Sequence, residues 1–377
     1  MRIAQIAPLT EAIPPQLYGG TERVVSWLTE ELVELGHDVT LFASGDSRTS
    51  AKLEAMWPRA LRLDDTVRDP MALHIAMLEH VRRRADDFDI LHFHLDYFPF
   101  SIFSRQATPF ITTMHGRLDL PEHQTVFDSF NAIPVVSISD AQRRPVPQAH
   151  WLKTIYHGLP SRLLRPRAVE PRYLAFLGRI APEKAVDRAI RIAVRCKMPL
   201  KIAAKVDRVD RDYFEREIRP MLDLPGIEFI GEIGDEQKSE FLSGASALLM
   251  PIDWPEPFGL VMIEAMACGT PVVAYPNGSV REVVEHGLTG LVVDDEIAAA
   301  DAIIGQLGNL SRRKIRARFE ERFTARRMAN DYLDTYRELM APAKRRLRTV
   351  NGAAKTTPRH QDGRHQTGID GGVYVAD

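Results

Sequence analysis

An alternation of short apolar runs with amphipathic segments constrains the fold of this chain more than any other feature. Residues 2–7 form an apolar run typical of a strand, and residues 24–35 then carry apolar side chains at the spacing of one helix face. Gly36 follows as a helix C-terminal cap, and residues 39–43 form a second apolar run. This order predicts a βαβ unit and therefore a parallel sheet.

The same alternation continues along most of the chain. The later predicted strands are 90–94, 111–115, 135–139 and 154–157, and then 173–177, 200–204, 227–230, 247–250, 271–274 and 290–293. Helices are predicted between them, among others over 71–84, 185–196 and 258–268. We therefore expect an α/β protein with two doubly wound parallel-sheet domains in tandem.

Composition marks the domain boundaries. The segment PSRLLRPRAVEP, residues 160–171, is basic and rich in proline, which is typical of a linker. The end of the chain is rich in Lys, Arg, Gly and Thr and has little apolar content, so we predict that it is disordered. The predicted parts are an N-terminal domain (1–160), a linker (161–171), a C-terminal domain (172–322), a helix (323–340) and a disordered tail (341–377).

Composition also excludes several classes of protein. The chain has 377 residues and a formal net charge of -2, which argues against a nucleic-acid binder. Its two cysteines, Cys196 and Cys268, lie far apart, so neither a disulfide framework nor a cysteine metal site is predicted. We find no apolar run long enough to span a membrane and no signal-peptide core, so we expect a cytoplasmic protein.

Candidate ligand-binding residues follow several predicted strands, where open parallel sheets bind their ligands. Gly19 and Gly20 precede a helix, where free backbone N–H groups suit an anion, although a simple tight turn explains them equally well. Their spacing is not GxGxxG, which disfavours a dinucleotide cofactor. His115 also follows a strand; it is placed to bond a polar ligand, against the alternative of a packed histidine.

A second group of polar residues surrounds the predicted strand 90–94. His92 and His94 are two residues apart, which places both on one face of that strand, and Asp96 follows closely. We find no third ligand to complete a metal site, so we predict none.

Two cations follow the strand predicted over 173–177. Arg179 and Lys184 lie five residues apart in a loop that opens a helix, an arrangement suited to a diphosphate. The alternative is a solvated loop at a helix start. Their place at the end of a strand favours the diphosphate site.

Two glutamates, Glu256 and Glu264, flank a further predicted helix start, and the second lies within an apolar run. A buried carboxylate needs a partner, and the hydroxyl pair of a ligand is one such partner. The alternative is an ion pair between Glu264 and a neighbouring arginine.

Together these segments resemble the retaining glycosyltransferases of family 4, which have the GT-B fold. The resemblance extends to about residue 340 and depends on four segments in order: YGGTERVV (18–25), THG (113–115), GRIAPEK (178–184) and EPFGLVMIEAMACGTPVVA (256–274). The last contains the family's E-x7-E signature and the strand that follows it. The resemblance implies two Rossmann-like domains facing across a cleft, the first binding an acceptor and the second a nucleotide sugar.

The resemblance also implies roles for individual residues. By position, Arg179 and Lys184 bind the donor diphosphate and stabilise the leaving group, Glu264 binds the ribose hydroxyls, and Glu256 lies against the sugar hydroxyls. The backbone of Phe258, Gly259 and Leu260 contacts sugar and phosphate, His115 lies near the reacting face of the sugar, and Gly19 and Gly20 close over the phosphate. His94 and Asp96 are candidate donor or acceptor contacts.

The sequence departs from the family pattern in two places. Asn277-Gly278-Ser279 replaces the common Gly-Gly, so Gly278 is a candidate donor or acceptor contact that shapes donor choice. Lys205 stands where a glycine-rich strand end is frequent, and it is a candidate third phosphate contact.

These roles predict a metal-independent, retaining hexosyltransferase that needs no cofactor and uses a nucleotide sugar, with UDP-glucose as the first choice. The acceptor is not identified by the sequence: a small molecule, a polysaccharide and a lipid-linked sugar all remain open, as does the oligomeric state. The alternatives are a GT-B sugar-nucleotide epimerase and a catalytically silent sugar-nucleotide-binding protein. Arginines between 312 and 327 suggest a weak peripheral contact with the inner face of the membrane, against the favoured alternative of a solvated helix face.

Overall fold

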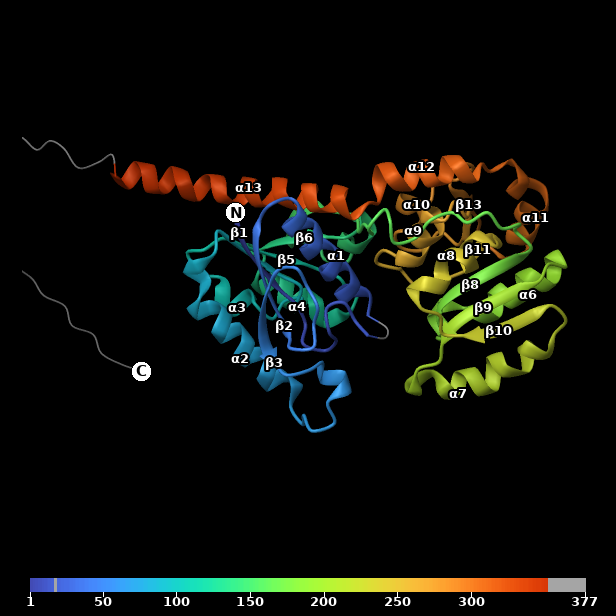
Figure 1. Ribbon diagram of the computed structural model, residues 1–377, viewed down its shortest axis with the longest axis horizontal. Helices are drawn as coiled ribbons and strands as arrows, with labels where there is room; N and C mark the ends of the chain where they lie inside the picture. Colours follow the sequence, from blue (N-terminus) through green and yellow to red (C-terminus); the bar gives the residue numbers. More distant parts are fainter. Residues whose placement is uncertain (17–18, 352–377) are drawn as a thin grey trace, which may run out of the picture. The chain divides into compact units, whose positions relative to one another are not determined.

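The computed structural model describes residues 1–16 and 19–351, with residues 342–351 described by their backbone alone (Figure 1). Seven parallel strands form the first sheet, in the order β3-β2-β1-β4-β5-β6-β7. They are β1 (Arg2–Ile6), β2 (Asp38–Ser44), β3 (Lys52–Trp57), β4 (Ile90–Phe93), β5 (Phe110–Thr113), β6 (Pro134–Ser137) and β7 (His150–Thr154).

Six parallel strands form the second sheet, in the order β10-β9-β8-β11-β12-β13. They are β8 (Tyr173–Arg179), β9 (Leu200–Lys205), β10 (Ile227–Gly231), β11 (Ala245–Met250), β12 (Val272–Ala274) and β13 (Gly290–Val292). Each sheet reverses its strand order once, beside β1 and beside β8, as doubly wound folds do. The predicted pair of doubly wound parallel-sheet domains is therefore confirmed.

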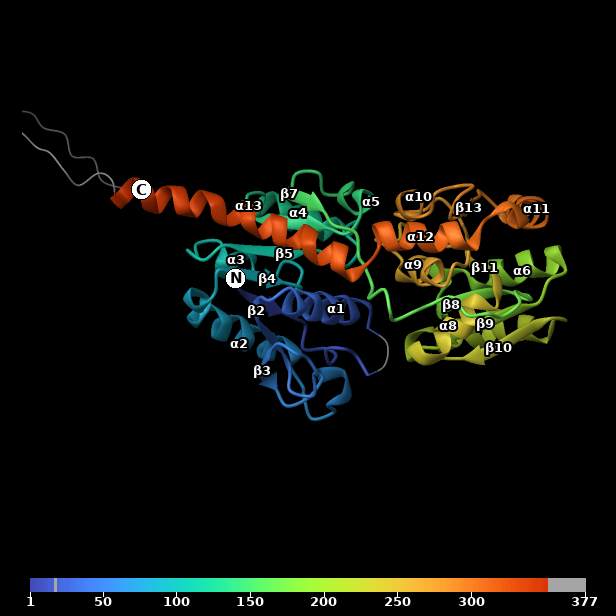
Figure 2. The same ribbon diagram turned by 45° about the horizontal axis from the view of Figure 1, so that its top comes forward.

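Helices connect the strands in both domains. The first domain contains α1 (Gly20–Glu34), α2 (Pro70–Arg83), α3 (Phe100–Phe103), α4 (Pro121–Ser129) and α5 (Asp140–Arg143). The second contains α6 (Val186–Cys196), α7 (Arg211–Tyr213), α8 (Asp235–Ser243), α9 (Leu260–Ala267), α10 (Val280–Val283), α11 (Glu296–Gln306) and α12 (Arg312–Arg322), and α13 (Ala325–Asn351) follows it. In both views α12 lies beside α9 (Figures 1 and 2).

Two predictions about edge strands were wrong. The prediction missed β3, and it placed β7 at 154–157, whereas the structure has β7 at His150–Thr154. Both strands lie at an edge of the first sheet and are only half-buried, so polar side chains interrupt their apolar pattern. Pairing with β6 sets the register of β7, with Pro134 opposite His150 and Ser137 opposite Thr154.

Two predicted helix boundaries also differ from the structure. The helix predicted from residue 258 begins at Leu260, because Gly259 before it has a left-handed φ of 77°. The helix α13 continues to Asn351 and so includes the first residues of the segment predicted to be a disordered tail. The rest of that segment, 352–377, lies outside the described residues.

The part of helix α13 up to Met340 packs against the first sheet, although it follows the second domain in sequence. Its side chains Tyr332 and Tyr336 are fully buried. The hydroxyl of Tyr336 lies 2.7 Å from His92 Nδ1 in β4, and that of Tyr332 lies 2.9 Å from Thr113 Oγ1 in β5. The last described helix therefore completes the core of the first domain.

A second contact joins the two domains through a carboxylate. Glu282, in α10, accepts hydrogen bonds of 2.7 Å from the backbone N–H groups of Asp140 and Ala141. These N–H groups begin the helix α5 of the first domain and have no partner within it. Glu282 lies just after the unusual Asn277-Gly278-Ser279 sequence, and its carboxylate supports the contact between the domains.

The arginines suggested as a membrane-facing group have partners within the protein, apart from the exposed Arg313. The partners are carbonyls of Ser243 and Ala245 for Arg312, carbonyls of Ser161, Leu164 and Ala267 for Arg316, Glu285 for Arg318 and Arg322, Glu31 and Glu34 for Arg326, and carbonyls of Tyr156 and His157 for Arg327. Because these groups hold α12 and α13 in place, the membrane contact stays a prediction without structural support. No helix in the part of the chain that the structure describes is both long and apolar enough to cross a bilayer.

Arg327 provides a test of this structural role. Replacing it (Arg327→Met) removes the donor to two carbonyls and the partner of Asp331, so we expect the free energy of unfolding to fall by about 1.5–3 kcal/mol. The matched control is Arg313→Met, which should change it by less than about 0.5 kcal/mol. Chemical denaturation measures both, and equal effects would contradict the assignment.

Candidate functional site

A cavity of about 520 Å³ lies at the carboxyl ends of strands from both sheets. Its walls come in part from loops that follow β1 and β5 in the first sheet and β8, β9 and β11 in the second. Of these strands, β1, β8 and β11 stand where the strand orders reverse. Among the predicted site residues it is lined by Gly19, Gly20, His115, Arg179, Lys184, Lys205, Glu256, Phe258, Gly259, Leu260 and Glu264. Gly278, His94 and Asp96 are not part of its walls.

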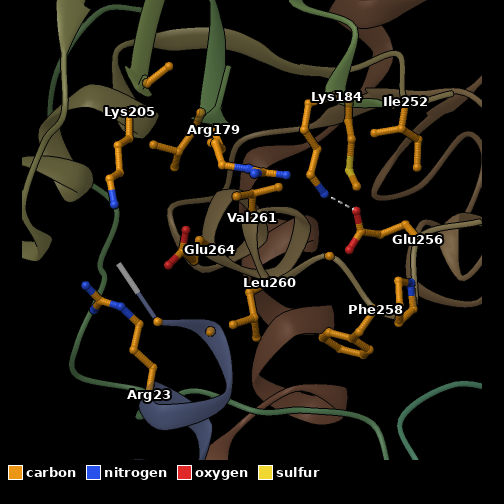
Figure 3. Close-up of a pocket in the computed structure, with 18 of the residues that line it drawn as sticks. Arg23, Arg179, Lys184, Lys205, Ile252, Glu256, Phe258, Leu260, Val261 and Glu264 are labelled. Atoms are coloured by element: carbon orange, nitrogen blue, oxygen red, sulfur yellow. Dashed lines mark hydrogen bonds and ion pairs between the residues drawn. The ribbon is translucent and has the colours of Figure 1, made fainter. Parts of the chain in front are cut away.

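The two predicted phosphate-binding cations point into this cavity (Figure 3). Arg179 is the last residue of β8, and Lys184 ends a short 3-10 turn, Pro182–Lys184, before α6. Arg179 donates to Asp210 at 3.0 Å and is also paired with Glu183, whereas Lys184 is paired with Glu256. Both cations are therefore held in ion pairs at the carboxyl edge of the second sheet.

Glu256 is held by several neighbours in the loop after β11. Its carboxylate accepts a hydrogen bond of 2.9 Å from Trp254 Nε1 as well as the bond from Lys184. The ammonium of Lys184 also lies 4.9 Å from the centre of the Trp254 ring, a cation–π distance. Trp254 was missed by our sequence prediction, although its place two residues before Glu256 is a usable signal.

Gly278 supports this loop from behind. Its φ is 62°, and a Cβ atom there would come within 2.3 Å of the backbone nitrogen and oxygen of Glu256. Ser279 donates its backbone N–H to the Glu256 carbonyl at 2.9 Å. Gly278 was a candidate donor or acceptor contact, whereas the structure places it outside the cavity wall as a support for the Glu256 backbone.

A glycine also sets the start of α9. Gly259 has a left-handed φ, and a Cβ atom there would meet the methyl groups of Met250 and Met262 at 2.8 Å. The chain therefore turns sharply before the helix, which places Leu260 and Val261 in the cavity wall at its first turn. The N–H groups of a first turn have no partner within the helix, so a ligand oxygen can accept from them.

Glu264 has a charged partner in the protein. Its Oε1 accepts a bond of 2.7 Å from Lys238 Nζ in α8, and only 5% of its side chain is exposed. The alternative stated for Glu264, an ion pair with an arginine, is thus partly correct: it has an ion pair, but the cation is a lysine. Glu264 is also one of the residues that line the cavity.

The ion pair of Glu264 extends to the first domain. Lys238 also lies 3.2 Å from Asp235, and Asp235 accepts a bond from Arg23 of α1. Burial alone would raise the pKa of Asp235, but Lys238 and Arg23 outweigh burial and lower it. Burial alone would lower the pKa of Lys238, but Glu264 and Asp235 outweigh burial and raise it. We missed Arg23, Asp235 and Lys238, whose spacing alone carries no signal of a site.

A further cation lines the cavity beside Arg179. Lys205 is the last residue of β9, which pairs with β8 in the register that places Lys205 opposite Arg179. Its ammonium lies 2.8 Å from a carboxylate oxygen of Asp207. In the view of Figure 3, Arg179, Lys184 and Lys205 lie along one side of the cavity and Arg23 on the other, with Glu264 between them.

The first domain contributes a glycine-rich turn and a histidine. Gly19 and Gly20 stand at the start of α1, and a Cβ atom at Gly19 would meet Glu22 Oε2 at 2.8 Å, so the turn packs closely. His115 follows β5, and burial lowers its pKa to about 3, so it is neutral at physiological pH. The histidine therefore offers the cavity a neutral imidazole.

His94 and Asp96, which follow the strand β4, do not line the cavity. His94 is buried behind His115, and Asp96 lies in the exposed loop that follows. The rings of His92 and His94 are 4.1 Å apart, which agrees with the period-two placement on one face of β4. Within residues 1–16 and 19–351 no group of three or more His, Cys, Asp or Glu side chains is arranged to hold a metal ion.

Comparison with known proteins gives two family matches that follow the two domains. Residues 18–151 match the model of Glycosyltransferase Family 4, and residues 165–324 match that of Glycosyl transferases group 1. Phosphatidyl-myo-inositol mannosyltransferase of Mycolicibacterium smegmatis is 28% identical over 347 residues, which span 81% of this chain and 85% of that protein. D-inositol 3-phosphate glycosyltransferase of Salinispora tropica is 32% identical over 193 residues, or 46% of this chain and 40% of that one.

Solved structures share the fold. Sucrose-phosphate synthase from Thermosynechococcus elongatus superposes with a TM-score of 0.75 at 21% identity, covering 90% of this chain and 99% of that one. Anabaena HepE in complex with UDP and glucose superposes with a TM-score of 0.70 at 20% identity, covering 90% and 100%.

Two parallel-sheet domains with a shared cavity at their strand ends define the GT-B fold. The chain belongs to glycosyltransferase family 4, and it is a hexosyltransferase. The resemblance given by the four sequence segments is confirmed.

The buried ion pair of Lys238 and Glu264 in the cavity wall can be tested by its effect on stability. Replacing its lysine (Lys238→Met) leaves the Glu264 carboxylate buried without a cation, so we expect unfolding to require about 3–5 kcal/mol less free energy. The control is Lys201→Met, because Lys201 pairs with Glu228 at an exposed site and should contribute less than about 1 kcal/mol. Urea denaturation compares the two, and a loss at Lys238 no larger than at Lys201 would contradict the buried pair.

Proposed function

We propose that this glycosyltransferase moves glucose from UDP-glucose to an acceptor, with retention of configuration and without a metal ion. One observation carries the proposal: Arg179 and Lys184 line the same cavity as Glu256 and Glu264, at the carboxyl ends of β8 and β11. The cavity therefore offers cations for a diphosphate and carboxylates for hydroxyl groups, the two kinds of group that a nucleotide sugar presents.

The cations stabilise the leaving group. Cleavage of a sugar–phosphate bond places developing negative charge on the diphosphate, and preset cations stabilise that charge where it forms. One such donor contributes about 2.7–4 kcal/mol to the barrier, or about 10²–10³ in rate. In this proposal Arg179 and Lys184 provide that stabilisation in place of a metal ion.

The ion pairs of these cations suggest how the donor enters. A diphosphate carries more charge than one carboxylate, so it competes with Glu256 for Lys184. When Lys184 turns to the phosphate, the Glu256 carboxylate becomes available to accept hydrogen bonds from sugar hydroxyls. Binding of the donor diphosphate to Lys184 then releases the Glu256 carboxylate in the same step.

The second glutamate suits the other end of the donor. Lys238 binds Oε1 of Glu264 and so leaves Oε2 to accept from the hydroxyls of a ribose. Glu256 and Glu264 then bind the two ends of the donor, the sugar and the ribose. The retained configuration follows from acceptor attack on the face from which the diphosphate departs.

The donor is chosen from the solved relatives. A crystal structure of Anabaena HepE is in complex with UDP-glucose, and HepE has the same fold at 18% identity. Inositol stands in the names of both curated relatives described above, so a phosphorylated polyol is an acceptor class worth testing first. Detection of a transferred sugar, as opposed to an isomerised donor, separates this proposal from a GT-B epimerase.

Turnover tests the diphosphate site. Arg179→Ala and Lys184→Ala each remove one cation from the leaving group, so we expect each to lower turnover at least tenfold with the fold intact. The control is Arg191→Ala, because Arg191 lies on α6 and pairs with Asp187 and Glu296 outside the cavity. Normal turnover in both cavity variants would refute the assignment.

The donor can be identified by thermal shift. UDP-glucose, UDP-N-acetylglucosamine, GDP-mannose and ADP-glucose are compared at equal concentration, and we expect UDP-glucose to raise the melting temperature most. A ligand at about 100 times its Kd stabilises the folded state by about 2.7 kcal/mol, which is measurable as a shift of the melting temperature. A larger shift with GDP-mannose would replace the proposed donor and leave the class of reaction intact.

A further inference from the structure

A chain of hydrogen bonds between buried side chains leads from α13 to the cavity. Gln5 in β1 stands at its centre, with its Nε2 3.2 Å from the hydroxyl of Tyr336 and its Oε1 2.8 Å from His94 Nε2. His94 Nδ1 then lies 2.8 Å from Nε2 of His115, which lines the cavity. The chain ends there, because His115 Nδ1 is buried and has no partner among the described residues.

The direction of each bond follows from the amide of Gln5. In the orientation of this amide that the structure has, its carbonyl oxygen faces His94 Nε2 and can only accept, so His94 carries its proton on Nε2 and donates it to Gln5. Burial lowers the pKa of His94 well below its usual value, and the ring is neutral, so its Nδ1 is an acceptor. His115 must then donate from Nε2 to His94, and this fixes its proton on Nε2.

The other side of Gln5 is consistent with this direction. Gln5 Nε2 donates to the oxygen of Tyr336 and faces His92 Nδ1 at 3.4 Å, and Tyr336 in turn donates its hydroxyl proton to the same nitrogen at 2.7 Å. His92 Nε2 donates to Thr113 Oγ1 at 2.7 Å, which leaves the threonine proton for Tyr332. With the Gln5 amide in this orientation, donors and acceptors match along the whole network when His115 carries its proton on Nε2.

We propose that Gln5, His94 and Tyr336 are positioning residues that hold His115 as its Nε2–H tautomer, so that His115 Nδ1 accepts a hydrogen bond from a hydroxyl of the donor sugar. This inference rests on the proposed function, and it specifies how the first domain recognises the sugar. It makes α13 part of the donor site, although no α13 side chain lines the cavity in the described residues.

The tautomer decides what the histidine recognises. A neutral acceptor nitrogen binds an O–H group and has nothing to donate to a phosphate oxygen, so His115 selects the sugar end of the donor. The buried Nδ1 of His115 makes no hydrogen bond until a hydroxyl group binds to it. A sugar with a hydroxyl at that position is therefore bound more tightly than the corresponding deoxy sugar. The opposite tautomer would present a donor and lose this preference.

The tautomer can be measured without substrate. In protein labelled with ¹⁵N-histidine, we expect His115, assigned by its loss in His115→Asn, to show an unprotonated Nδ1 and a protonated Nε2. Gln5→Met removes the acceptor for His94 and should shift His115 towards the Nδ1–H form. A protonated Nδ1 in the unaltered protein, or a tautomer unchanged in Gln5→Met, would overturn the proposal.

Two tyrosines of α13 provide a matched pair. Both are buried, but only Tyr336 bonds Gln5, whereas Tyr332 bonds Thr113 at the far end of the network. Tyr336→Phe should change the His115 tautomer and lower kcat/KM with the proposed donor by about tenfold, with the affinity for UDP alone unchanged. Tyr332→Phe should leave the tautomer as it is, and equal changes in both variants would overturn the proposal.

A double-mutant cycle separates positioning from general structural damage. In the variant His115→Asn, the new side-chain amide oxygen stands near the place of the imidazole Nδ1 and accepts without help from His94. Gln5→Met should therefore lower kcat/KM about tenfold in the normal background and much less in the His115→Asn background. Equal losses in the two backgrounds would mean that Gln5 acts on the fold alone. The ¹⁵N measurement needs no donor, so a wrong tautomer is distinguishable from a wrong donor or a wrong reaction.

Discussion

The main cations that face the cavity are balanced by carboxylates, and the site depends on this balance. Arg179 has Glu183 and Asp210, Lys184 has Glu256, and Lys238 has Glu264 and Asp235. Positive charges gathered at one sheet edge would repel one another without these partners. The carboxylates therefore keep the cations together in the folded protein, and in the proposed reaction two of them also recognise hydroxyls.

The ion pairs differ in depth, and the difference separates their roles. Arg179 and Lys184 are partly exposed, so their pairs are weak enough for an anion to compete with them. Lys238 and Glu264 are deeply buried, so that pair is a fixed part of the cavity floor. One end of the cavity is thus adaptable, and the other is rigid.

The sequence was sufficient to predict charged side chains that follow the end of a strand, because ligands bind at that edge of a parallel sheet. Arg179, Lys184, Glu256 and Glu264 were found in this way, because the βα alternation fixes where strands end. The structure was needed for residues that act through three-dimensional neighbours. Gly278 supports Glu256 from behind, and Lys238 lies 26 positions from its partner. Edge strands were harder than central strands, because water on one side removes the apolar pattern.

The return of α13 to the first domain also has a consequence for synthesis of the chain. The side chains that fill the space over Gln5, His92 and Thr113 come from Tyr332 and Tyr336, which leave the ribosome after both sheets. The domain that is made first cannot finish its core until nearly the last described residues have emerged. Until then, the polar side chains of Gln5, His92 and Thr113 in the nascent first domain lack their tyrosine partners. The helix that covers them is synthesised only after the second domain.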